Sequence, residues 1–158
     1  MTRLSVPVVA GVVVMTLAAC GGSGSASAST PAPVAFDSTK FAPDLAVDLR
    51  SFTRLPSGMY IFDTRKGTGL VAAEGRKATF RYSAYLPDGS LVETQQQPIE
   101  AEMNDGMIKG LRFGMAGMRA GGQRRLVVPP SLAYGRSHVG RVPPNSTLVF
   151  DIDLVSVR

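Results

Sequence analysis

The C-terminal part of the chain alternates between apolar and polar positions. From Leu148 to Leu154 every second residue is large and apolar, and Asp151 and Asp153 fall between these residues. Because successive side chains of a strand point to opposite faces, this segment is predicted to be a strand with one face on a core. The two aspartates then belong to the outer face, which favours solvated carboxylates over a catalytic carboxylate pair.

Earlier segments have the same period of two. In "KATFRYSAYL" the residues Phe80, Tyr82 and Ala84 share one face, and the tight turn "PDGS" follows. Proline residues end the run "QRRLVV", as expected where a strand stops. Further strands are predicted in "SGMYIFDTRKGTG", "LVETQ" and "PIEAEM".

A single segment has helical spacing instead. Ile108, Leu111, Met115 and Met118 are separated by 3, 4 and 3 positions, so they lie on one face of a helix that "AGG" ends. Most connections between the strands are too short for a parallel crossover. The sequence therefore predicts an α+β fold in which a curved antiparallel sheet of five to six strands wraps around one short α-helix.

The N-terminal segment differs in pattern from the rest. Residues 1–19 begin with a positive charge and continue as an apolar run of signal-peptide length, too short to span a bilayer comfortably. The run ends in "LAAC", which resembles a bacterial lipobox, so Cys20 is predicted to carry a lipid such as diacylglycerol or palmitate. An ordinary secretory signal with an incidental cysteine is the alternative.

The next residues are predicted to link this signal to a folded domain. Residues 20–35 are small and polar, as in a flexible tether. Residues 36–56 regain apolar side chains and form either a short helix or an extended arm packed on the domain, which occupies residues 57–158. The protein is therefore expected outside the cytoplasm, anchored by lipid to a bacterial membrane that could be the outer membrane.

Composition narrows the possible chemistry. The chain has 158 residues, 44% of them hydrophobic, which suits one globular domain, and a net charge of +5. Its cations are scattered without an aromatic ladder, which argues against nucleic-acid binding. The only cysteine is Cys20 and the only histidine is His138, so we expect no internal disulfide, no Cys–His nucleophile, no metal and no cofactor.

Three stretches together resemble the FKBP-type peptidyl-prolyl cis–trans isomerases. They are "YSAYLPDGSLVET", "MIKGLRFGMAGMRAGGQRRLVVPPSLAYG" and "VPPNSTLVFDIDL", in the order and near the spacing that the family has, within residues 57–158. The resemblance implies an enzyme that accelerates rotation about X-Pro bonds of secreted or envelope proteins. It also implies an apolar pocket between the sheet and the helix, and a monomer.

The resemblance also implies roles for individual residues. Tyr82, Glu93, Ile108 and Tyr134 match catalytic positions, where Ile108 donates its backbone N–H and Tyr134 its hydroxyl to the bound peptide. The positions that match substrate-binding residues are Val92, Ile99, Met107, Leu111, His138, Val142 and Phe150. Core packing is an equal alternative for Val92, Ile99 and Phe150, and an exposed loop histidine without a role is an alternative for His138.

This chain departs from the family at the pocket. Leu111 stands where the family has tryptophan, Val92 and Ile99 replace wall aromatics, and Glu93 replaces an aspartate. The loop "ETQQQP" between Val92 and Ile99 is predicted to be short and polar. We therefore expect a wider, shallower pocket with weaker macrolide binding and lower activity. The alternatives are a weakly catalytic chaperone for proline-containing segments and, less favoured, a membrane-surface adaptor.

Overall fold

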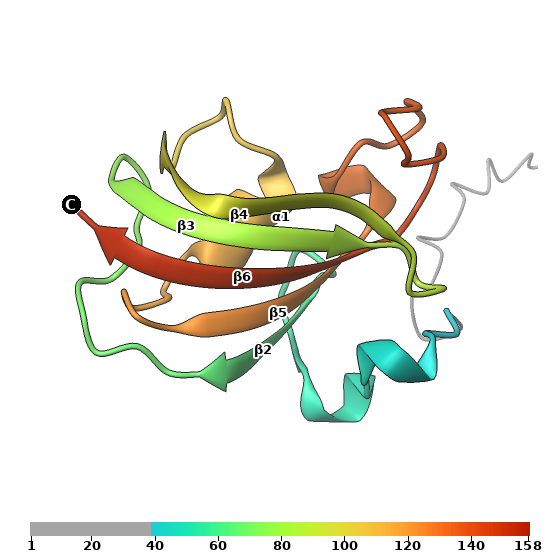
Figure 1. Cartoon of the computed structure of the whole chain (residues 1–158), viewed down its shortest axis with the longest axis horizontal. Helices are drawn as coiled ribbons and strands as arrows, with labels where there is room; N and C mark the ends of the chain where they lie inside the picture. The colour runs from blue at the N-terminus through green and yellow to red at the C-terminus, as the bar shows by residue number, and fades with distance from the viewer. Residues whose placement is uncertain (1–38) are drawn as a thin grey trace, which may run out of the picture. The chain divides into compact units, whose positions relative to one another are not determined.

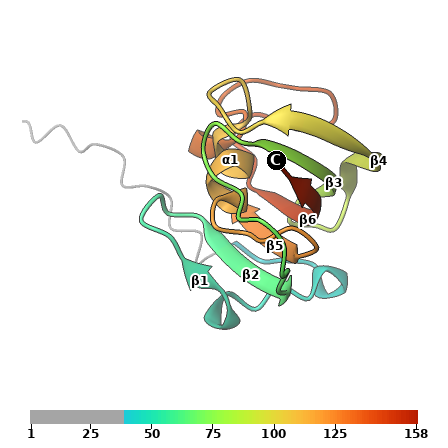
Figure 2. The ribbon, with the colours of Figure 1, turned by 90° about the vertical axis from the view of Figure 1, so that its left-hand side faces the viewer.

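The computed structural model describes residues 39–158, and a six-stranded antiparallel sheet is its main feature (Figure 1). Along the sheet the strands follow the order β1-β2-β5-β6-β3-β4. Their bounds are Thr53–Arg54 for β1, Tyr60–Arg65 for β2, Lys77–Tyr85 for β3, Leu91–Glu102 for β4, Gln123–Val128 for β5 and Leu148–Val157 for β6. The sheet curves around the helix α1, Lys109–Met115, as Figure 2 shows, which confirms the predicted fold class.

The strands β3 and β6 form the centre of the core, as their alternation predicts. Phe80 and Ala84 in β3, and Phe150, Ile152 and Leu154 in β6, are all at most 2% exposed. The two strands pair side by side, with Ala84 opposite Phe150 and Tyr82 opposite Ile152. Their apolar faces therefore form one continuous surface that α1 covers.

The prediction of a short loop between Val92 and Ile99 is wrong, because these residues belong to the strand β4. "LVETQ" and "PIEAEM" belong to one strand, and the residues between them form a bulge. Tyr82 pairs with Gln95 and Phe80 pairs with Ile99, so residues 96–98 face a single residue of β3. Pro98 cannot donate a backbone hydrogen bond, and an edge strand with a bulge accommodates it.

The helix α1 is shorter than the apolar spacing predicts. Ile108 is its N-cap, with an extended ψ of 127°, and Met118 lies beyond the helix end. Gly117, with a φ of +77°, turns the chain directly after the helix. Both residues still contact the core, since Met118 is 3% exposed and Ile108 packs against its edge.

Residues 41–52 cover part of the other face of the sheet, as an arm packed on the domain. The arm contains two short 3₁₀ turns, η2 at Pro43–Leu45 and η3 at Leu49–Ser51, and leads into β1 (Figure 1). Leu45 and Phe52 bury against Tyr60, Val127 and Val149. Val149 is completely buried although it lies on the face predicted to be polar, because the arm covers it.

Three sequence predictions lie outside the described residues: the signal peptide 1–19, the tether 20–35 and the lipidation of Cys20. Within residues 39–158, no helix is long and apolar enough to cross a membrane.

Candidate functional site

The side chain of Tyr82 lies at the edge of the helix-side core and is hydrogen-bonded to Glu93. The Tyr82 hydroxyl donates to Glu93 Oε1 at 2.5 Å, across the paired strands β3 and β4. The Tyr82 ring lies 6.1 Å from the ring of Phe150 at an interplanar angle of 52°. The longer side chain of Glu93 therefore still reaches the tyrosine hydroxyl.

The apolar residues predicted to line the pocket gather around the same core. Leu111, Val142 and Phe150 are buried members of it, at most 5% exposed. Five more pack against it and are half-buried: Val92, Ile99, Met107, Ile108 and Tyr134. These residues come from β4, β6, α1 and the loops beside them, so the tertiary structure gathers positions that are far apart in the sequence.

Two polar hydrogens in this group are candidate donors to a bound peptide, because neither has a partner among the described residues. Within residues 39–158 the backbone N–H of Ile108 makes no hydrogen bond, since the N-cap residue precedes the first turn of α1. The hydroxyl of Tyr134, just after the turn η4 (Pro130–Leu132), also makes none within residues 39–158. Both groups belong to residues that pack on the apolar core, which makes them available donors in an apolar setting.

Burial and a nearby carboxylate keep both tyrosines protonated. Burial raises the pKa of Tyr82, and the hydrogen bond to Glu93 and the charge of Glu93 raise it further. Burial also raises the pKa of Tyr134, with a smaller effect from the charge of Glu93. Each phenol therefore stays a hydrogen-bond donor through neutral pH.

The loop between η4 and β6 holds two predicted site residues, one buried and one exposed. Val139 and Val142 exchange two backbone hydrogen bonds, of 3.1 and 2.8 Å, which close a tight turn at its tip. Val142 points into the core, whereas His138 is exposed and has no hydrogen bond or ion pair within the described part of the chain. His138 is thus the predicted site residue that is exposed and without a polar contact to the others within residues 39–158.

Sequence reasoning placed Phe80 on the core face but did not assign it to the site, and it missed the role of two glycines. Phe80 is buried beside Tyr82, with ring centroids 6.1 Å apart. Gly110 and Gly114 let α1 approach β5 closely, since a Cβ on either would lie 2.3 Å from Val128 or Leu126 side-chain atoms. The sequence contains an indication of this close approach, because the two glycines are four positions apart and therefore share one helix face.

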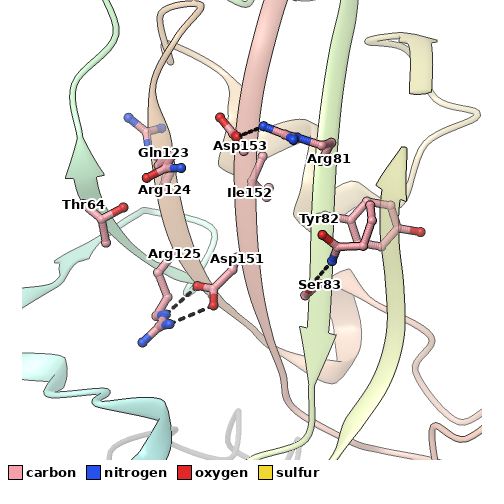
Figure 3. A pocket seen from close by; sticks show the side chains of 11 residues that line it. Thr64, Arg81, Tyr82, Ser83, Gln123, Arg124, Arg125, Asp151, Ile152 and Asp153 are labelled. Carbon is pink, nitrogen blue, oxygen red and sulfur yellow. Dashed lines mark hydrogen bonds and ion pairs between the residues drawn. The ribbon is translucent and has the colours of Figure 1, made fainter. Parts of the chain in front are cut away.

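Another hollow opens on the opposite face of the sheet, and Tyr82 is the one residue of this group among its lining residues (Figure 3). It has a volume of about 480 Å³, and its lining side chains are mostly polar. Arg125 forms a two-pronged ion pair with Asp151, and Arg81 pairs with Asp153. The two aspartates are therefore partnered by arginines. No group of three metal-ligating side chains occurs within residues 39–158.

The profile of the FKBP-type peptidyl-prolyl cis-trans isomerases matches residues 69–155, more than half of the chain. The chain belongs to this family. The matched FKBP domain includes Tyr82, Glu93, Ile108 and Tyr134.

Curated relatives with similar sequences include FKBP-type proteins of fungi and plants. FK506-binding protein 4 of Mycosarcoma maydis is 38% identical over 118 residues, 73% of this chain and 32% of its own length. Peptidyl-prolyl cis-trans isomerase FKBP16-4, chloroplastic, of Arabidopsis thaliana is 34% identical over 118 residues, 68% of this chain and 51% of its own length. The chain thus spans about a third to a half of these relatives.

Two solved structures of bacterial proteins have a similar fold. A peptidyl-prolyl cis-trans isomerase of Pseudomonas syringae pv. tomato is 30% identical with a TM-score of 0.63, and the match covers 68% of this chain and 80% of that one. FkpA of Escherichia coli is also 30% identical, with a TM-score of 0.65 and coverage of 73% of this chain and 55% of that one.

Proposed function

We propose that this FKBP domain accelerates the cis–trans rotation of X-Pro bonds in protein substrates. The observation that carries the proposal is that two donors, the Ile108 N–H and the Tyr134 hydroxyl, have no partner within residues 39–158 and belong to residues that pack on one apolar core. An extended peptide offers backbone carbonyls to such donors while its proline ring contacts the apolar side chains.

The reaction rotates an amide and leaves every covalent bond in place. The barrier is about 18–20 kcal/mol because rotation destroys amide resonance. The planar amide is charge-separated and well hydrated, so an apolar surface that removes water disfavours it more than the twisted form. A reduction of about 5.5 kcal/mol corresponds to about ten-thousandfold acceleration, and it comes from tighter binding of the twisted amide.

The proposed roles follow from the chemistry of each side chain. Ile108 and Tyr134 donate hydrogen bonds to substrate carbonyls, and Glu93 holds Tyr82 in place through its hydrogen bond. The proline ring lies against Tyr82 and Phe150. The remaining proposed contacts, Val92, Ile99, Met107, Leu111 and Val142, complete the apolar surface, and His138 contacts the substrate from the loop.

The test is the rate of cis-to-trans conversion of a Leu-Pro peptide. Tyr134→Phe removes one neutral hydrogen bond, worth about 0.5–1.5 kcal/mol, so kcat/KM should fall about two- to tenfold. Ile108→Pro removes the N–H, and the Ile108 φ of −52° already suits proline. The kcat/KM of Ile108→Pro should be lower than that of Ile108→Ala, because the alanine variant shortens the side chain but keeps the N–H.

Tyr85→Phe is the matched control, because Tyr85 packs on the arm side of the sheet. It should leave kcat/KM unchanged. If folded Tyr134→Phe and Ile108→Pro variants, verified by thermal unfolding, both keep the full rate, the assignment of this site is wrong.

A second candidate function is a chaperone that binds proline-containing segments with little catalysis. The aliphatic Leu111 favours it, because the family has tryptophan at this position, and the same change predicts weak macrolide binding. Leu111→Trp should then raise both the isomerase rate and macrolide affinity. Suppression of aggregation by the unaltered chain without any acceleration of isomerisation would favour the chaperone.

We also propose that the protein acts outside the cytoplasm as a monomeric bacterial lipoprotein. The support is the "LAAC" sequence before the small, polar residues 21–35. Proline-containing segments of secreted or envelope proteins are then its substrates. Cys20→Ala should abolish metabolic labelling with palmitate and release the protein from membranes, and retained labelling would contradict this proposal.

A further inference from the structure

A second hollow lies where β2 ends and β5 begins, at the left end of the sheet in Figure 1. Its volume of about 330 Å³ falls at the lower end of the range for small-ligand sites, about 300–1,000 Å³. None of the residues assigned to proline isomerisation lines it. Its charged lining residues are Asp63, Arg65, Lys66, Arg119 and Arg124.

The deepest of these charges already form a neutral pair. Arg124 is only 8% exposed and binds both carboxylate oxygens of Asp63, at 2.5 and 3.1 Å. It also donates to the carbonyl oxygens of Gly114 and Ala116 at the end of α1. With Asp63 and Arg124 neutralised, the charge of the hollow comes from Arg65, Lys66 and Arg119.

These three cations keep donors free toward solvent. Arg65 Nε donates a hydrogen bond to the Gly121 carbonyl oxygen at 3.0 Å, and Arg119 Nη1 donates one to the Gly69 carbonyl oxygen at 3.2 Å. Arg65 Nη2 also forms an ion pair with Asp153 Oδ1 at 3.5 Å, a carboxylate that it shares with Arg81, and Arg65 Nη1 has no partner within residues 39–158. Lys66 is exposed and has no ion pair or hydrogen bond within residues 39–158.

Close backbone packing brings the three cations together. A Cβ on Gly67 would lie 2.1 Å from the Arg119 carbonyl oxygen, and one on Gly122 would lie 2.9 Å from the Gly67 nitrogen. The segment after β2 therefore lies directly against the turn before β5. Because contacts to backbone carbonyls hold two of the guanidinium groups, little side-chain entropy remains to be lost when an anion binds.

We propose that this hollow binds a phosphate-bearing ligand through Arg65, Lys66 and Arg119. Arginine presents paired N–H groups to phosphate oxygens, and lysine adds a point charge. The phosphate belongs either to a small soluble molecule or to the headgroup of an anionic phospholipid. Both sources present the same chemistry to the three side chains.

The experiment measures binding of two probes to the full-length chain at low ionic strength, where screening is weakest. Pyrophosphate is titrated while backbone amide NMR signals are followed. In parallel, the fraction of protein that sediments with vesicles is compared for phosphatidylglycerol and phosphatidylcholine. The test variant is Arg65→Gln/Lys66→Gln/Arg119→Gln. The control, Lys40→Gln/Arg54→Gln/Arg76→Gln, removes the same net charge from outside the hollow.

We expect saturable shifts at Lys66, Gly67, Gly117 and Arg119, and affinity about tenfold weaker in the test variant alone. Specific pyrophosphate binding identifies a soluble ligand. A lipid headgroup is identified if more protein sediments with phosphatidylglycerol than with phosphatidylcholine, if only the test variant loses this difference, and if pyrophosphate does not bind. Equal weakening in both triple variants, or no binding of either probe, would overturn the proposal.

Discussion

At the scale of single residues, Glu93 and Tyr82 show how one hydrogen bond links two strands at the candidate site. The hydroxyl-to-carboxylate distance of 2.5 Å holds although glutamate is one methylene longer than the family's aspartate. Glu93 is exposed, so its backbone and stem can adjust to keep the contact. A Glu93→Asp variant of this chain should therefore still be able to orient Tyr82.

The raised pKa values of Tyr82 and Tyr134 predict a loss of stability in alkali. Above the ordinary tyrosine pKa of about 10, the unfolded chain loses these protons while the folded chain retains them. The free energy of unfolding should therefore fall as the pH rises above about 10. Chemical denaturation between about pH 8 and 11 measures this slope.

The slope should be smaller in Tyr82→Phe/Tyr134→Phe, because that variant lacks both phenols. Comparison of slopes, rather than of absolute stabilities, separates this effect from the packing cost of the substitutions. An unchanged slope in the double variant would contradict the assigned cause.

At the scale of elements, the position of α1 depends on two glycines. A helix of seven residues has little intrinsic stability, so packing against β5 must hold it in place. Gly110 and Gly114 allow contact with Val128 and Leu126, both of which are fully buried. The same packing positions Ile108, the N-cap whose N–H is the proposed donor.

Gly114→Ala should destabilise the domain despite the better helix propensity of alanine. The propensity gain is about 1 kcal/mol at most, whereas overpacking a closed core costs about 1–3 kcal/mol. The new Cβ would lie 2.3 Å from Leu126 Cδ1, and Leu126 is completely buried. Urea denaturation measures the change.

Leu126→Ala tests the cause of this cost. The double variant Gly114→Ala/Leu126→Ala should be more stable than the sum of the two single changes predicts, because the shortened side chain removes the clash. Lys109→Ala, at an exposed position of the same helix, is the control and should change stability by less than about 0.5 kcal/mol. Strict additivity would argue against the steric explanation.

At the scale of the whole molecule, the folded unit begins well before residue 57. The arm packs Leu45 and Phe52 on the face of the sheet that α1 leaves uncovered. Arg125 joins the two parts, since its guanidinium pairs with Asp151 and donates to the Leu45 carbonyl. The helix therefore covers one face of the sheet, and the arm covers the part of the other face around Val127 and Val149.

Leu45→Ala should lower the stability of the entire domain rather than detach the arm alone. Leu45 is 5% exposed, and truncation of a buried leucine costs about 2–5 kcal/mol. The variant should unfold in one cooperative transition at a lower Tm, as followed by circular dichroism. Asp44→Ala, at the exposed neighbouring position, should leave the Tm nearly unchanged. A separate early transition would indicate that the arm folds independently.

The sequence by itself determined the fold class and most of the strands. Alternation in β3 and β6 is a local property of the chain, so it can be read without knowledge of any partner strand. The sequence also proposed the candidate site residues, because they lie in motifs whose residues and spacing resemble those of the family. The prediction that Cys20 carries a lipid likewise rests on neighbouring residues alone.

Only the tertiary structure decided which surfaces meet. It joined the two segments of β4 through a bulge, because pairing with β3 outweighs the local effect of Pro98. It buried Val149 beneath an arm about a hundred residues earlier in the chain, and it left His138 exposed. It also brought Arg65, Lys66 and Arg119 around one hollow. Contacts between distant segments depend on long-range packing, which no local pattern records.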